Sequence, residues 1–177
     1  RNIAENLARL RVPVTLVTRL GRDAASERIL HFMKTLGVNT EHVSYSETHP
    51  TSTYTAIIEE GGEMAIACGD MDIVHELTAE QVSSALLSLR PQDLVVIDSN
   101  FSPEAACEIL TQVPQSVQKW VVPVSAPKMK EYKKVLSFLD GIILNEGELE
   151  VLSGQSISNS SDLDSALLDL IASGIHH

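Results

Sequence analysis

Short polar sequences follow apolar runs at several places in the chain, and their residue types are suited to binding and phosphate chemistry. Asn145-Glu-Gly-Glu148 comes directly after an apolar run and opens a helical pattern. The first backbone amides of a helix have no partner within the helix and can bind phosphate. A carboxylate one turn in, at Glu148, could hold Mg²⁺ or its water shell beside that phosphate. The alternative is a capping box, in which Asn145 and Glu148 only satisfy each other's backbone amides.

Three further places carry polar side chains with two interpretations each. Asp98-Ser-Asn100 follows a second apolar run, so it either faces a ligand crevice or forms a turn. Lys128 follows a Pro-bounded loop and either meets a phosphate or only begins a helix. Asp70 and Asp72 form a carboxylate pair that either binds sugar hydroxyls or is a solvated turn.

Other kinds of site are excluded by the sequence. It has no Gly-x-Gly-x-x-Gly and no Walker-type phosphate loop. Its 6 histidines, which include His176 and His177, show no metal-ligand spacing. Its 2 cysteines, Cys68 and Cys107, cannot form a disulfide scaffold or a cysteine-based zinc site, and they favour a reducing compartment.

The composition is that of a globular domain with an acidic surface. The chain has 177 residues and a formal charge of −11, which argues against nucleic acid or an anionic membrane as its partner. No apolar run approaches the roughly 18 residues of a membrane span. We therefore expect a cytoplasmic protein that binds a small molecule, with an organelle such as the mitochondrion left open.

Helical and strand patterns alternate along the sequence and must position these residues. Apolar spacing and capping residues predict helices over 2–11, 23–36 (capped by Asp23), 78–89, from 103, 128–136, 145–154 and 161–172 (capped by Ser161). Runs of β-forming residues predict strands over 12–17, 51–58, 63–68, 93–98, 117–122 and 141–144, with a loop over 69–73.

This alternation predicts an α/β fold. Strands with apolar interiors between helices are typical of a doubly wound, mostly parallel sheet with helices on both faces. The two strands around Glu59-Glu-Gly-Gly62 instead predict a β-hairpin inserted into that core. In such sheets ligands bind beyond the carboxyl ends of the strands, where the polar sequences lie.

Taken together, these features resemble the ribokinase-type carbohydrate kinases, the phosphofructokinase-B family. Arg1-Asn-Ile-Ala-Glu-Asn-Leu-Ala-Arg-Leu10 is similar to the helix after that family's Gly-Gly motif, and Leu20-Gly-Arg-Asp23 is similar to its next unit. The hairpin at 53–68 resembles the β-lid that closes over the sugar. Asn145-x-x-Glu148 matches the family's Asn-x-x-Glu motif. Within the family, 4–8, 51–55 and 69–73 are most similar to the pseudouridine kinases.

The resemblance implies a ribokinase-like fold, a reaction and a set of site residues. The complete protein would use ATP and Mg²⁺ to phosphorylate the 5′-hydroxyl of pseudouridine, and the β-lid, over about 44–75, would form a homodimer contact. Asn2, Thr53, Asp70, Asp72 and Asn100 would then bind the substrate. Residues Asn145, Glu148 and Lys128 would bind the cofactor, with Glu148 at the metal.

The same resemblance predicts that residues 1–177 form a single, partial kinase domain that is incomplete at both ends. The family's Gly-Ala-Gly-Asp motif, which supplies the anion hole and the general base, is expected beyond residue 177, so the isolated chain is expected to be inactive. Two alternatives stay open. The protein could be another sugar or nucleoside kinase, such as a ribokinase or adenosine kinase, or a shortened noncatalytic isoform that acts as a binding or dimerisation module.

Overall fold

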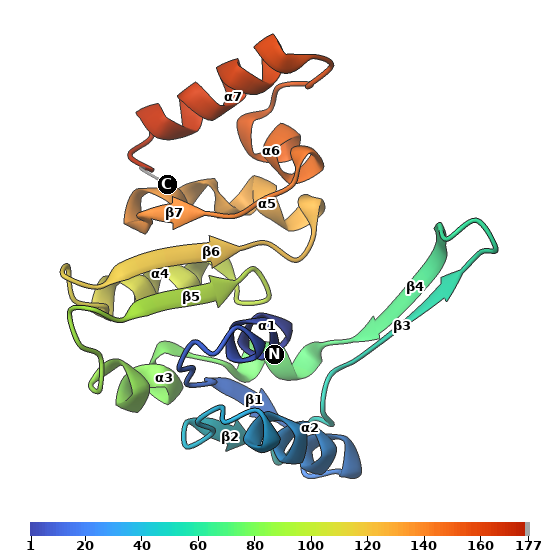
Figure 1. Ribbon diagram of the computed structural model, residues 1–177, viewed down its shortest axis with the longest axis vertical. Coiled ribbons are helices and arrows are strands. Elements are labelled where there is room, and N and C mark those ends of the chain that lie inside the picture. The colour runs from blue at the N-terminus through green and yellow to red at the C-terminus, as the bar shows by residue number, and fades with distance from the viewer. Residues whose placement is uncertain (176–177) are drawn as a thin grey trace. The chain divides into compact units, whose positions relative to one another are not determined.

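The computed structural model describes residues 1–175, and the chain divides into two compact units, Arg1–Ala85 and Leu86–His177 (Figure 1). Each unit is described by itself. His176 and His177, whose spacing indicated no metal site, lie outside the described residues.

The first unit combines a small parallel sheet with an antiparallel hairpin. Strands β1 and β2 pair in parallel, with Thr18 opposite Val43 and Leu20 opposite Tyr45. Strands β3 and β4 pair antiparallel, with a register shift between Ile57 and Ile58. The elements are α1 (Asn2–Arg9), β1 (Thr18–Leu20), α2 (Ala24–Thr35), β2 (Val43–Tyr45), β3 (Thr53–Ile58), β4 (Met64–Asp70), the 3-10 helix η1 (Asp72–Glu76) and α3 (Ala79–Leu86).

The second unit is built on a parallel sheet of 3 strands in the order β5-β6-β7. Because consecutive strands are neighbours and parallel, a helical connection returns the chain to the start of the next strand each time. The elements are β5 (Leu94–Asp98), α4 (Pro103–Gln112), β6 (Gln118–Val122), α5 (Ala126–Tyr132), the 3-10 helix η2 (Lys133–Phe138), β7 (Gly141–Ile142), α6 (Glu146–Ser153) and α7 (Ser160–Ala172).

Each unit has its own hydrophobic core. In the first unit Ala4, Leu16, Met33 and Val38 bury their side chains together. The second unit has a larger core, in which side chains of the sheet and of η2 pack with those of helices α4 to α7. It includes Val121 and Val135, together with the helical residues Ala106, Leu110, Met129, Leu149, Leu152 and Leu170. Burial of one such large side chain contributes about 1.5–3 kcal/mol, so these cores stabilise the sheet edges where the polar loops begin.

The fold class predicted from the sequence is confirmed, and so are most of its local signals. The mostly parallel α/β core and the inserted hairpin are both present. Asp23 caps α2, because its side chain accepts a hydrogen bond from the Ser26 amide. Gly154 ends α6 in the left-handed conformation, at φ 77°, where a glycine costs least.

Several element boundaries differ from the prediction. The strand expected over 12–17 begins only at Thr18, because Pro13 lacks an amide hydrogen and Thr15 makes only an isolated bridge to Asn39. Strand β2 was not predicted, because three residues are too few to show the alternation of apolar and polar residues that is typical of a strand. Part of the expected loop over 69–73 is regular secondary structure, because β4 extends to Asp70 and η1 begins at Asp72.

Two helix predictions also need correction. Ser161 does not cap the last helix, because the side chain of Asn159 accepts hydrogen bonds from the amides of Ser161 and Asp162. The helix expected over 128–136 is divided into α5 and η2, which meet between Tyr132 and Lys133.

Gly21 is the residue that lets β1 and the segment before the hairpin approach each other. A Cβ atom at this position would lie 2.4 Å from the Thr51 nitrogen and 2.7 Å from the Pro50 carbonyl carbon. The Gly21 amide also donates to Thr51 Oγ1 at 2.9 Å. The contact is between backbones, so no side-chain movement can relieve it.

We expect Gly21→Ala to destabilise the protein by about 1–3 kcal/mol, the range for forcing extra volume into a packed site. Urea unfolding measures this difference. Gly61→Ala is the matched control, because a Cβ at Gly61 meets nothing within 4 Å. Equal stability of the two variants would show that the Gly21 contact relaxes at no cost.

Candidate functional site

The structure brings two of the predicted substrate residues together on one face of the hairpin. Thr53 and Asp70 are direct register partners, so their side chains lie on the same face of β3 and β4. Asp72 follows as the first residue of η1. All three residues are exposed, and among the described residues neither carboxylate has a hydrogen-bond or ion-pair partner. The hydroxyl and the carboxylates are therefore accessible to a polar ligand.

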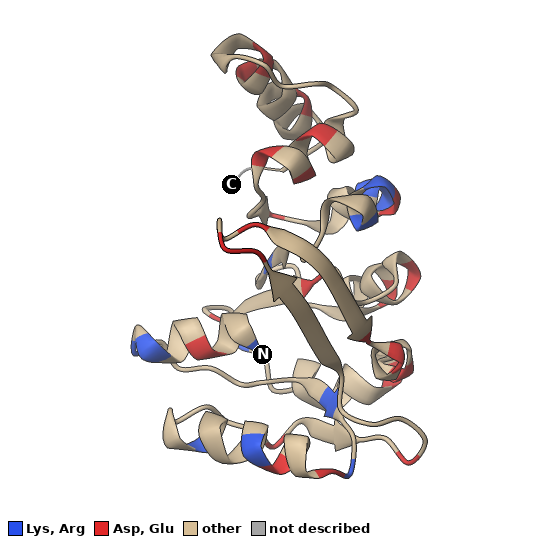
Figure 2. Ribbon diagram, turned by 90° about the vertical axis from the view of Figure 1, so that its right-hand side faces the viewer, with Lys and Arg blue, Asp and Glu red and all other residues tan. Residues whose placement is uncertain are grey.

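The hairpin itself exposes an unusual amount of apolar surface for two strands. Every residue of β3 is exposed, and its large apolar side chains remain in contact with solvent. The exposed set comprises Tyr54, Ile57, Ile58, Met64 and Ile66, each more than half accessible. Figure 2 shows no Lys or Arg on either strand, while acidic residues gather at the turn between them. A patch of this kind marks a binding surface.

The segment that enters the hairpin is fixed to the body of the first unit by Asp23. Asp23 Oδ2 accepts a hydrogen bond from the Thr51 amide at 2.7 Å, and Oδ1 accepts one from Thr51 Oγ1 at 2.9 Å. These bonds, with the one from the Ser26 amide, hold the pKa of Asp23 below its ordinary value. The carboxylate thus caps α2 and places Thr51, two residues before Thr53.

A second carboxylate, Glu76, follows the hairpin and accepts hydrogen bonds from the segment that enters the hairpin and from β1. Its Oε1 accepts from Thr48 Oγ1 at 2.6 Å and from Ser46 Oγ at 2.9 Å, and it lies 2.6 Å from His49 Nδ1. Its Oε2 forms an ion pair with Arg19 Nε on β1. These partners, above all the Thr48 hydroxyl and then His49, lower the pKa of Glu76 to about 2.

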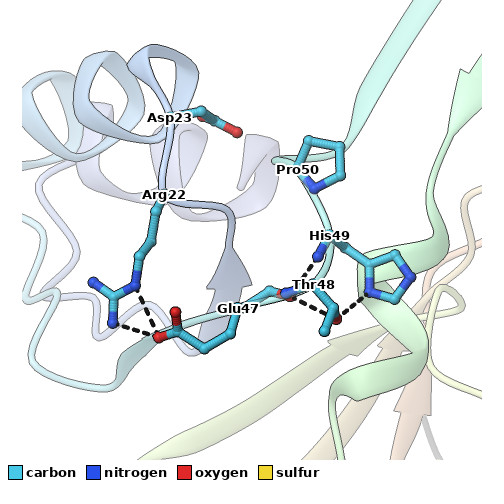
Figure 3. Close-up of a pocket in the computed structure, with 7 residues that line it drawn as sticks. Arg22, Asp23, Glu47, Thr48, His49 and Pro50 are labelled. Carbon is cyan, nitrogen blue, oxygen red and sulfur yellow. Dashed lines mark hydrogen bonds and ion pairs between the residues drawn. The ribbon is translucent and has the colours of Figure 1, made fainter.

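The segment between β2 and β3 also lines a small cavity of about 250 Å³ with the start of α2 (Figure 3). In Figure 3 the side chains of Arg22 and Glu47 point toward one another, and they form an ion pair at 2.7 Å. The His49 ring points to the Thr48 hydroxyl, 3.0 Å away. Two pairs of polar side chains around this cavity, Arg22 with Glu47 and Thr48 with His49, thus contact one another.

Asn2 lies at the first position of α1 and is exposed. Its Oδ1 accepts a hydrogen bond from Arg1 Nη1 at 2.9 Å, and the Arg1 guanidinium stands 5.6 Å from the centre of the Phe32 ring on α2. The Asn2 side chain thus lies at the exposed start of the helix with its oxygen paired to Arg1.

In the second unit, two of the predicted site residues meet directly. Lys128 Nζ donates a hydrogen bond to Asn100 Oδ1 at 3.0 Å, which joins the segments that follow β5 and β6. The side chain of Asp98 accepts from the Asn100 amide at 2.9 Å and forms the turn that presents it. The turn interpretation of 98–100 is therefore confirmed, and the interpretation that these residues face a ligand stays a prediction.

Two buried side chains hold this pair in place, and the sequence did not reveal them. Ser99 is almost fully buried, and its Oγ accepts from the Val124 amide at 3.0 Å. The Tyr132 hydroxyl donates to the Phe101 carbonyl oxygen at 2.8 Å, and burial raises the pKa of Tyr132 far above its ordinary value. Both bonds join residues more than twenty positions apart, which no local pattern in a single sequence predicts.

Asn145 and Glu148 form the capping box that was one of the two interpretations of this motif. Asn145 Oδ1 accepts from the Glu148 amide at 2.9 Å, and Glu148 Oε2 accepts from the Asn145 amide at 3.0 Å. Glu148 is only 6% exposed. The box uses one oxygen of the carboxylate, so the capping and metal interpretations are compatible. Helix α6, which begins after Asn145, packs against α5, the helix that carries Lys128.

A metal ion bound by the described acidic residues would need further ligands from a phosphate or from water. Within residues 1–175 no group of three or more His, Cys, Asp or Glu side chains could hold a metal ion by itself. Mg²⁺ is commonly bound through one or two carboxylates together with phosphate and water, so a single carboxylate at a helix start fits that ion. In the same described range, no helix is both long and apolar enough to cross a membrane.

We expect Asn145→Ala to destabilise the second unit by about 1 kcal/mol, because the helix loses its capping acceptor. Asn145→Ser should stay close to the parent, since a serine hydroxyl can accept from the same amide. Chemical denaturation of the three proteins provides the comparison. Equal losses in both variants would show that the loss does not arise from the missing capping acceptor.

Comparisons with known proteins add the following findings. The model of the family described as pfkB family carbohydrate kinase matches residues 1–177. The chain is 31% identical over 163 residues to a pseudouridine kinase of Escherichia coli K12, an alignment that covers 92% of this chain and 52% of that protein. It is 30% identical over 175 residues to an uncharacterized sugar kinase of the same strain, with 99% and 48% covered.

Among solved structures, a putative sugar kinase from Clostridium perfringens superposes with a TM-score of 0.80 at 30% identity. That superposition covers 98% of this chain and 55% of the other. The chain thus spans about half the length of the curated relatives it matches. The predicted resemblance to this family and its fold is confirmed.

Proposed function

The chain belongs to the pfkB family of carbohydrate kinases, and from this premise we propose that the whole protein transfers a phosphoryl group from ATP to the 5′-hydroxyl of pseudouridine. The family supports the sugar or nucleoside kinase reaction. The finer choice of pseudouridine is supported by the 31% identity to a pseudouridine kinase and by the similar stretches at 51–55 and 69–73.

The observation that carries the proposal is the hydrogen-bonded pair of Lys128 and Asn100 at one edge of a parallel sheet. The carboxyl ends of β5 and β6 both open at this edge, which is where ligands bind in such folds. We propose that Lys128 faces phosphate oxygens and that Asn100 orients it through this hydrogen bond. The backbone amides at the start of α6 are the second proposed phosphate contact.

Glu148 is the proposed contact for Mg²⁺. Its buried carboxylate is held by the Asn145 amide through Oε2 at 3.0 Å, so its position is fixed before any ion arrives. When bound, ATP would supply the phosphoryl group and Mg²⁺ would neutralise part of the charge on the phosphate oxygens. The part of this chain is to orient the ion's water shell from one side.

We propose that the nucleoside is bound by residues of the first unit. Asn2 would contact the ribose, and the face of the hairpin that carries Thr53 and Asp70 would close on the part of the ligand beyond the ribose. Asp72, exposed at the start of η1, would accept from a further polar group of the ligand. Two carboxylates and a hydroxyl are suited to the several N–H and O–H donors of a nucleoside.

Residues 1–177 contain no Gly-Ala-Gly-Asp, the sequence that carries the anion hole and the general base in similar kinases. We therefore expect the purified chain to bind pseudouridine in a calorimetric titration but to form no phosphorylated product with ATP and Mg²⁺. Ribose, adenosine and uridine serve as the comparison ligands. Product above background would contradict the expected inactivity, and tighter binding of ribose or adenosine would favour the corresponding kinase instead.

The same titrations test the role of the hairpin. Thr53→Ala and Asp72→Asn should change the order of affinities among these ligands, whereas Glu131→Gln, an exposed residue of the second unit, should not. An unchanged order in both hairpin variants would remove the hairpin from the proposed site.

A second candidate function is a dimerisation module, and the exposed apolar side chains of the hairpin favour it. Ile57 and Ile66 are each at least 60% exposed and face each other in the ladder, and pairing with the hairpin of a second copy would bury them. We expect sedimentation at micromolar concentration to show a dimer that Ile57→Lys/Ile66→Lys converts to a monomer. These two residues are opposite one another in the ladder, so the substitutions act on one face. A parent protein that is already monomeric would exclude this contact.

A further inference from the structure

The base of the hairpin has two roots, and they differ in how they are attached. We call 46–52 the entering root and 71–76 the leaving root. The entering root is tied to the α/β body at Thr51 through the Asp23 carboxylate and the Gly21 amide. The leaving root buries Ile73, which is 1% exposed. Its Glu76 side chain forms hydrogen bonds and an ion pair with other segments of the unit.

Glu76 ends η1, six residues after the last residue of β4, and its carboxylate reaches the opposite root. It accepts from the hydroxyls of Ser46 and Thr48 and faces the His49 ring. Its other oxygen pairs with Arg19 on β1, one of the two strands of the parallel sheet in this unit. One carboxylate thus joins three segments of the chain: the leaving root, the entering root and β1.

Ser46 extends this connection into the backbone. It is 2% exposed, and while its hydroxyl donates to Glu76 the same oxygen accepts from the amides of Thr48 at 3.1 Å and His49 at 2.8 Å. The Ser46 amide donates to the Leu20 carbonyl at 2.8 Å, which continues the pairing of β1 and β2. The turn of the entering root is therefore built around the group that Glu76 holds.

We infer that Glu76 is a positioning residue for the nucleoside site, because it fixes the distance between the two roots of the β3–β4 hairpin. Thr53 follows the entering root directly, and Asp72 lies in the leaving root, so the spacing of the roots sets the spacing of these side chains. The role assigned to Thr53 and Asp72 rests on the proposed function. The attachment of the roots by Glu76 does not.

Glu76→Gln is the variant that separates charge from shape. The glutamine keeps one acceptor oxygen, but its NH₂ group replaces the other. Either Arg19 or the entering root, with its hydroxyls and the His49 ring, therefore loses its acceptor. Glu47→Gln is the matched control. Glu47 is also paired with an arginine, Arg22, and lies in the same root, but its side chain is 71% exposed.

Amide hydrogen exchange of the 177-residue chain tests the attachment without any ligand. In Glu76→Gln, amides of 46–49 and 71–77 should exchange about tenfold faster, the change expected when a hydrogen bond to a charged group is lost. Exchange in α2 and throughout the second unit should match the parent, and Glu47→Gln should match it everywhere. Unchanged exchange at both roots in Glu76→Gln would overturn the inference, as would a uniform increase across the first unit, which would indicate a general loss of stability.

Calorimetric titration with pseudouridine tests the consequence for binding. Glu76→Gln should weaken binding by about tenfold while Glu47→Gln keeps the parent affinity. Faster root exchange with parental affinity would show that the roots do not position the nucleoside site, and would overturn the positioning role. If the parent itself binds no pseudouridine, the proposed substrate fails, and the exchange experiment alone decides whether Glu76 attaches the roots.

Discussion

Parallel pairing of neighbouring strands is the constraint on which the proposed phosphate side depends. Because β5, β6 and β7 run in the same direction, the segments that leave them open at one edge of the sheet. Asn100 and Lys128 are 28 positions apart in sequence, yet this topology brings their side chains within 3.0 Å. An antiparallel arrangement would send alternate loops to opposite ends and would separate them. The buried Ser99 and Tyr132 then remove the remaining freedom of these loops.

The hairpin presents the opposite situation, since no core stabilises it. Its strands are exposed on both faces, so its position depends on the few bonds at its base. Those bonds converge on two carboxylates, Asp23 for the entering root and Glu76 for the leaving root. A hairpin attached in this way can move as a unit while the body of the fold stays unchanged. That property suits a ligand that must enter and leave.

Local chemistry explains which features the sequence could predict. Asp23 caps a helix through a bond to a residue three positions away, and Asn145 and Glu148 form a box of the same span. Signals of this kind lie within one helical turn, so they can be recognised in the sequence. Glu76 binds residues about thirty positions away, and β1 is located by a partner strand that is itself only three residues long. Long-range pairing of this kind produces no periodic pattern in the sequence. Neither the contacts of Glu76 nor the start of β1 could therefore be predicted.

We have proposed that the hairpin face with Thr53 and Asp70, together with the start of α1, recognises a nucleoside. An amide chemical-shift map of the 177-residue chain on addition of pseudouridine tests this recognition. We expect shifts that are concentrated at Asn2 and its neighbours, at Thr53, and between Asp70 and Asp72, with much smaller shifts for ribose. A map confined to α7 or to residues of the hydrophobic cores, or no change at millimolar pseudouridine, would contradict it.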